Sequence, residues 1–182
     1  MHGLIFTELE KFVAETAGPK TWRAAVEQAG LGAHVYRPVA SYPDAELERI
    51  VARLARVTRK PAAELIEAFG AKLAGSLLNT YASLLAPDWR TLDLIEHVGD
   101  TIHGVIQLRE RGAQRPLLRG ARVSPGEVEL IYGSQRRLCA LARGLARGVA
   151  HHNDEQLRVE ERECMHSGAP VCRMRFQLVE AA

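Results

Sequence analysis

The stretch Val128-Glu129-Leu130-Ile131-Tyr132-Gly133-Ser134-Gln135-Arg136 joins an apparent strand to three polar side chains at alternate positions. Residues of one parity share a face of a strand, so Tyr132 lies with the inward apolar residues and its hydroxyl needs a partner. Arginine binds carboxylates through two parallel hydrogen bonds, and hydroxyls at Tyr132 and Ser134 add donors. The stretch favours a strand whose exit holds carboxylates; a solvated polar exit is the alternative.

An apolar stripe at helical spacing precedes this stretch and carries a histidine on its edge. The stripe comprises Leu92, Ile95, Val98, Ile102 and Ile106. His103 lies beside it, and neutral imidazole is a common protein ligand of haem iron. A histidine that bonds a backbone carbonyl at the edge of the core is the other interpretation. His97, one and a half turns earlier, competes for the ligand role.

The arrangement resembles the haem-nitric oxide/oxygen binding (H-NOX) family, in which a histidine is followed at this interval by Tyr-x-Ser-x-Arg. In the family pattern the tyrosine follows the histidine by 29 positions. His103 stands at this interval from Tyr132, and His97 does not. Further similarities occur at Met1-His2-Gly3-Leu4-Ile5-Phe6, Tyr42-Pro43-Asp44 and Phe69-Gly70. The resemblance therefore covers nearly the whole chain.

The resemblance implies a haem b group with the iron ligated by His103 and the propionates bound by Tyr132, Ser134 and Arg136. Pro116 corresponds to a family proline that presses on the haem face, although the residue alone is also a plausible loop proline. The implied function is gas sensing without catalysis. NO would bind ferrous iron, break the iron-histidine bond and shift the helical lobe. The signal would pass to a separate partner, a histidine kinase or a cyclic-di-nucleotide enzyme.

The gas preference implied by the resemblance depends on the helix after the triad. Leu141 stands at about the position where O2-binding members carry a tyrosine, and Leu138 and Leu145 lie around it. Ile5 is expected in the pocket from the first helix. A pocket without a hydroxyl donor should favour NO, and also CO, over O2.

Three cysteines give a second candidate site. Cys164 and Cys172 flank one expected hairpin turn, and Cys139 lies in the helix expected over 135–150. Some H-NOX members hold a structural zinc through three cysteines and a histidine, but Glu161 stands where that histidine would be. Zinc accepts carboxylate oxygen, and His166 is an alternative fourth ligand. A zinc or thiol redox sensor is the alternative function; buried, unreactive cysteines are the simplest structural interpretation.

The hydrophobic pattern predicts an α+β fold. Helices are expected over 3–17, 20–28, 60–85, 89–108 and 135–150, and strands around a turn at Pro125-Gly126 and over 157–164 and 171–179. A further helix is expected from an entry at Tyr42-Pro43-Asp44, with an apolar stripe that runs from Leu47 to Val57. Thr58 and Asp88 are expected as helix caps. One H-NOX domain is predicted, with a helical N-terminal lobe over about 1–60 and a haem-ligating lobe over about 61–182. The antiparallel strands of the second lobe should pack against helices.

Composition limits the class of protein. The chain has 182 residues, 47% of them hydrophobic, and 24 Lys and Arg against 22 Asp and Glu. This balance indicates a globular domain and gives no reason to expect a nucleic-acid partner. No apolar run reaches the roughly 18 to 20 residues of a membrane span, which predicts a cytoplasmic protein. The sequence contains neither a nucleophile-base pair nor a phosphate-binding glycine loop, so these signs of an enzyme are missing from it.

Overall fold

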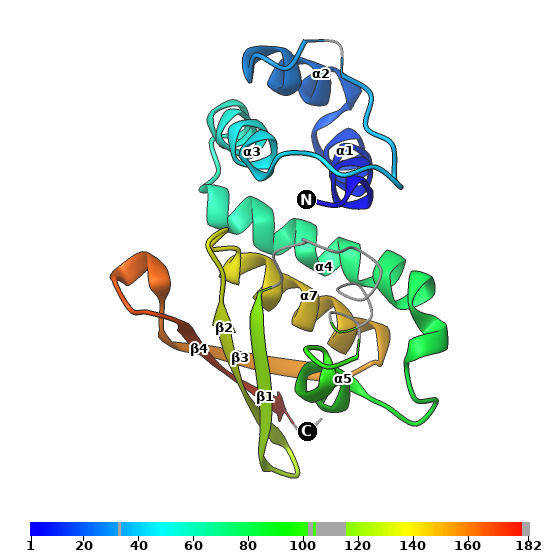
Figure 1. The fold of residues 1–182 in the computed structure, drawn as a ribbon, viewed down its shortest axis with the longest axis vertical. Coiled ribbons are helices and arrows are strands. Elements are labelled where there is room, and N and C mark those ends of the chain that lie inside the picture. Colours follow the sequence, from blue (N-terminus) through cyan, green and yellow to red (C-terminus); the bar gives the residue numbers. More distant parts are fainter. Residues whose placement is uncertain (33, 102–103, 105–115, 180–182) are drawn as a thin grey trace.

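A computed structural model of the protein describes residues 1–32, 34–101, 104 and 116–179. Four helices form the first part of the chain. They are α1 (Gly3–Ala17), α2 (Pro19–Gln28), α3 (Asp44–Thr58) and α4 (Ala62–Thr80). Gly18, at φ 87°, ends α1 in a conformation that glycine adopts freely, and Pro19 begins α2 at once. Figure 1 shows α1, α2 and α3 gathered above α4.

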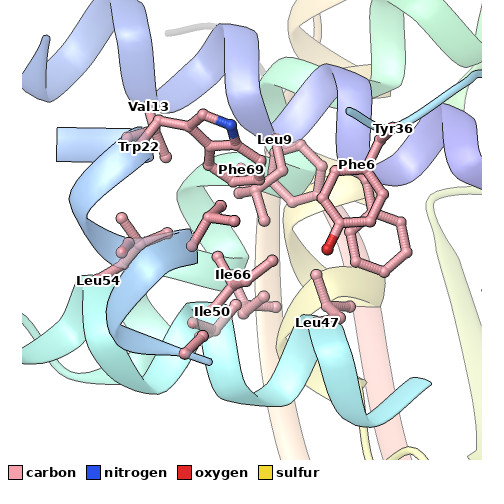
Figure 2. Close-up of a cluster of buried hydrophobic side chains, with 14 of the residues drawn as sticks. Phe6, Leu9, Val13, Trp22, Tyr36, Leu47, Ile50, Leu54, Ile66 and Phe69 are labelled. Atoms are coloured by element: carbon pink, nitrogen blue, oxygen red, sulfur yellow. The ribbon is translucent and has the colours of Figure 1, made fainter. Parts of the chain in front are cut away.

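The core of these helices is aromatic and aliphatic (Figure 2). Its buried residues include Phe6, Leu9, Val13, Trp22, Tyr36, Leu47, Ile50, Leu54, Ile66 and Phe69. The rings of Phe6 and Tyr36 stack with centroids 4.2 Å apart. Val57, which the apolar stripe predicts inside, is 46% exposed, because α3 ends one residue later and leaves that position at the rim.

Two predicted helix boundaries are wrong. The helix expected over 60–85 is α4, which ends at Thr80 and is followed by a separate 3₁₀ turn at Ala82–Leu84. Thr58 caps nothing: its hydroxyl donates to the carbonyl of Leu54 inside α3, at 2.7 Å. The residue that precedes α4 is Pro61, whose fixed φ suits a helix start.

The next helix is also shorter than predicted. α5 spans Thr91–His97 and is followed by a turn over 98–101. Its cap is Arg90, whose backbone N–H donates to Asp93 at 2.9 Å, instead of Asp88. Nearly all of the rest of the segment expected as helix to residue 108, with His103, lies outside the described residues.

Four antiparallel strands form one sheet in the order β1-β2-β4-β3. They are β1 (Leu117–Ser124), β2 (Glu127–Gly133), β3 (Gln156–Glu163) and β4 (Cys172–Val179). Val128, Leu130 and Tyr132 of β2 are buried, as their parity predicts, and so are Cys172, Met174 and Phe176 of β4. Helices α5 and α7 (Cys139–His152) contact this sheet (Figure 1). The predicted α+β class is confirmed.

Helices α4 and α7 touch through their backbones. A Cβ on Gly144 of α7 would lie 2.0 Å from the carbonyl oxygen of Glu67, and one on Gly70 of α4 would lie 2.7 Å from that of Leu141. The buried face of α7 therefore consists of small residues, namely Cys139, Ala140, Gly144, Ala146, Gly148 and Ala150. Leu138, Leu141 and Leu145 are only half-buried, and 135–138 precede α7 instead of belonging to it, which corrects the helix predicted over 135–150.

No helix within the described ranges is both long and apolar enough to cross a lipid bilayer.

Candidate functional site

The end of β2 and the turn into α7 bring the predicted triad together. Tyr132 is 5% exposed, and its hydroxyl oxygen accepts a hydrogen bond from the backbone N–H of Leu138 at 3.0 Å. The Ser134 hydroxyl accepts one from the backbone N–H of Arg136 at 3.2 Å. Burial raises the pKa of Tyr132, so the phenol keeps its proton and remains a donor at neutral pH.

Arg136 is held by a residue that the sequence pattern did not assign to the site. Its Nε donates to Oδ2 of Asp44 at 2.6 Å, and the amino group of Met1 lies 2.8 Å from Oδ1 of the same carboxylate. Burial alone would raise the pKa of Asp44, but hydrogen bonds from these two cations hold it below its usual range. The sequence pointed to Asp44 only as part of the Tyr42-Pro43-Asp44 segment and as an acidic residue at the start of a helix, and it gave no role at the site.

This donor set fits a carboxylate ligand. The guanidinium of Arg136 and the amino group of Met1 both contact the carboxylate of Asp44, so one positive charge is not neutralised. The guanidinium has five N–H donors, and only the one on Nε is bonded to Asp44. The hydroxyls of Tyr132 and Ser134 lie on the same turn. The residues present therefore match the carboxylates of a haem, although His103 lies outside the described residues.

The apolar residues expected in the pocket come from two helices. Ile5 of α1 and Leu141 and Leu145 of α7 are half-buried and pack against the first core. Pro116 is half-buried directly before β1. His97, the competing ligand, is exposed and its ring stacks on Trp89 at 4.8 Å between centroids.

The three cysteines form a cluster behind the triad. The sulfur of Cys164 lies 3.9 Å from those of Cys139 and of Cys172. One ligand atom from each cysteine and from Glu161 all lie within 4.8 Å of one another. Tetrahedral thiolates at a zinc-sulfur distance of about 2.3 Å are about 3.8 Å apart, so the spacing fits a zinc ion. Cys172 is the cross-strand partner of Tyr132, so the cluster adjoins the triad.

The fourth ligand position favours Glu161 over His166. The Nε2 atom of exposed His166 lies 2.9 Å from the carbonyl oxygen of Arg137, and the ring does not belong to the cluster that the described residues define. Burial raises the pKa of Cys139 to about 12, and burial likewise raises that of Cys172. Without a cation these thiols stay protonated at neutral pH.

The chain belongs to the Haem-NO-binding family, whose model matches residues 2–161. Its class is therefore that of the haem-based gas sensors.

Solved H-NOX structures agree in fold over almost the full chain. The H-NOX protein from S. oneidensis in the Fe(II)NO ligation state is 28% identical, with a TM-score of 0.91 and coverage of 99% of this chain and 100% of that chain. The H-NOX domain from Shewanella oneidensis in the Fe(II)CO ligation state gives 28% and 0.88, with 100% of each chain covered. An I5F mutant of T. tengcongensis H-NOX, 22% identical, covers 100% of both chains at a TM-score of 0.86 and supports the fold alone. No curated protein sequence matches the chain.

Proposed function

We propose that this protein senses NO, and also CO, at the ferrous iron of haem b and disfavours O2. A bound haem would supply a ferrous iron that can bind a diatomic gas, and His103 is the residue that would hold this iron. The observation that carries the proposal is the surplus positive charge around Asp44, beside the hydroxyls of Tyr132 and Ser134, in a chain of this family.

The protein's own residues would bind and orient the cofactor. Arg136, Tyr132 and Ser134 would hold the propionates, and Pro116 would press on the ring face. Ile5, Leu141 and Leu145 offer only hydrocarbon surface, which gives no hydrogen bond to the partly negative oxygen of bound O2. That none of these three side chains carries a donor supports the preference for NO and CO.

The signal would leave the site through Arg136. Its ion pair with Asp44 joins the turn before α7 to the first residue of α3, so movement at the carboxylate site reaches the helical lobe. We propose two lobes, about 1–60 and about 61–182, that shift against each other as a ligand-biased switch. The output would pass, without catalysis by this chain, to a partner such as a histidine kinase or a cyclic-di-nucleotide enzyme.

The test is the absorption spectrum of the reduced protein from haem-supplied cells, recorded alone and then with NO, CO and O2. A haem spectrum that responds to NO and CO but not to O2 is expected. His103→Gly should lose haem or its normal ferrous spectrum, whereas His97→Gly should keep both. Equal spectra for the wild-type protein and His103→Gly would overturn the ligand assignment.

The cysteine cluster supports a second candidate function, a zinc or thiol redox sensor. The observation in its favour is the spacing of Cys139, Glu161, Cys164 and Cys172, which suits one tetrahedral metal ion. Metal analysis of the purified protein should find zinc close to one ion per chain. Absence of zinc together with three freely titrating thiols would remove this candidate.

A further inference from the structure

Arg143 of α7 connects the cysteine cluster to α4. Its Nη1 donates to Oε1 of Glu161 at 2.7 Å, and its Nε donates to Oε2 of Glu67 at 3.0 Å. The Arg143 side chain is 17% exposed and that of Glu161 is 25% exposed, and Glu161 lies on the exposed rim of the cluster. Arg143 thus faces the carboxylate that, among the described residues, belongs to the cluster.

The charge of the cluster gives this contact a chemical role. Three thiolates and a carboxylate around a divalent cation leave two negative charges, whereas a neutral histidine in place of the carboxylate would leave one. An extra charge beside buried Cys139 and Cys172 is costly unless a cation compensates it. Carboxylates that bind metals are themselves usually hydrogen-bonded, because the outer partner fixes their orientation.

We propose that Arg143 is a positioning residue for a metal site made of Cys139, Cys164, Cys172 and Glu161, and that it compensates the charge that Glu161 adds. The inference rests on the second candidate function above. A carboxylate has two oxygens, so Oε1 can accept the bond from Arg143 while the other oxygen binds a thiophilic divalent cation such as zinc. The three thiols lose their protons when the cation binds.

The opposite side of Arg143 is fixed by α4. Glu67 accepts from Arg143 through Oε2 and from Arg147 through Oε1, the latter at 3.1 Å. Arg147 also approaches the carbonyl oxygen of Leu157 and has no bond to Glu161 among the described contacts. Glu67 therefore anchors the guanidinium at the close contact of α4 and α7, which holds Glu161 in reach of the sulfurs. Arg147 provides a matched control that shares Glu67 but not the cluster.

The experiment measures zinc affinity of the reduced, metal-free full chain by competition with a chromophoric zinc chelator. Arg143→Gln should weaken zinc binding about 10- to 100-fold, the usual effect of losing an outer partner of a metal ligand. Arg147→Gln should change it less than about twofold, and Arg143→Lys, which keeps the charge, should recover part of the loss. Cobalt(II) should give thiolate charge-transfer absorption that shifts in Arg143→Gln.

A double-mutant cycle separates this role from a general effect on folding. If Arg143 acts through Glu161, adding Arg143→Gln to Glu161→Gln should cost little more than Glu161→Gln alone. Wild-type affinity in Arg143→Gln, or fully additive losses, would overturn the role of Arg143 while leaving the metal site intact. Zinc binding that is absent from the wild type, or unchanged in Cys164→Ser, would overturn the metal site and this inference together.

Discussion

Arg136 and Asp44 join parts of the protein that are 92 positions apart in sequence, with 2.6 Å between Nε and Oδ2. Asp44 also forms an ion pair with the amino group of Met1, so one carboxylate connects the chain start, α3 and the turn before α7. Three segments that the family resemblance treats separately thus meet at a single ionic contact.

Replacing Asp44 by Asn should lower the free energy of unfolding by about 1 kcal/mol. The carboxylate serves two cations, but the Asp44 side chain is 34% exposed, so solvent reduces the value of both contacts. Urea unfolding followed by circular dichroism would measure the change. Glu48→Gln is the control, because it removes a charge from an exposed position on the same helix. Equal stability of the two variants would show that the ion pairs contribute nothing.

The advantage of the wild-type protein over Asp44→Asn should depend on pH. The pKa of Asp44 is lowered in the folded protein, so the unfolded chain takes up the proton first as pH falls. Since an unperturbed aspartate titrates near pH 3.9, the stabilisation should be complete above about pH 5 and should disappear as pH falls through the lower folded-state pKa. Unfolding free energies of both proteins between pH 7 and 3 would test this. An advantage at pH 3 equal to that at pH 7 contradicts the prediction.

Sequence periodicity predicted most of the fold because apolar side chains on one face are a local signal. It placed α1, α2, β3 and β4 within a residue or two, and it predicted the stripe of α3 and the turn between β1 and β2. It was wrong on the start of α7, which begins at Cys139 and not at residue 135, and it did not identify the small residues that form the buried face of this helix. The buried face follows instead from the direct contact of Gly144 with α4, and such a contact depends on two segments distant in sequence.

In the candidate site, too, the sequence revealed the residues that are close together in the chain and not the contacts between distant segments. Tyr132, Ser134 and Arg136 lie within five residues, so their alternation was visible, and the cysteine cluster was partly visible from its hairpin. No role at the site was evident from the sequence for Asp44 or for Arg143. Their roles arise from pairing with Arg136 and Glu161 across the tertiary structure, and a charged residue on a helix carries no local mark of such a partner.

Gly144→Ala should destabilise the protein by more than about 2 kcal/mol. The new Cβ would lie 2.0 Å from a carbonyl oxygen of α4, so the two helices must separate, and α4 and α7 each belong to a core. Gly75→Ala is a matched control on α4, since a Cβ there meets nothing within 4 Å. That variant should be neutral or more stable by up to about 1 kcal/mol, because alanine favours helix. Thermal unfolding of both would check the contrast, which equal melting temperatures would refute.

Leu141→Tyr should introduce O2 binding if Leu141 lines the gas pocket. Leu141 is half-buried on α7, and a hydroxyl at this position could donate to the partly negative oxygen of bound O2. One such hydrogen bond contributes about 1 kcal/mol, roughly a fivefold gain in O2 affinity. Absorption spectra of the reduced variant under rising O2 would measure it, with Leu141→Phe as the control that adds a ring without a donor. Equal O2 affinity in the two variants would contradict the prediction, because the tyrosine hydroxyl would then not reach the bound gas.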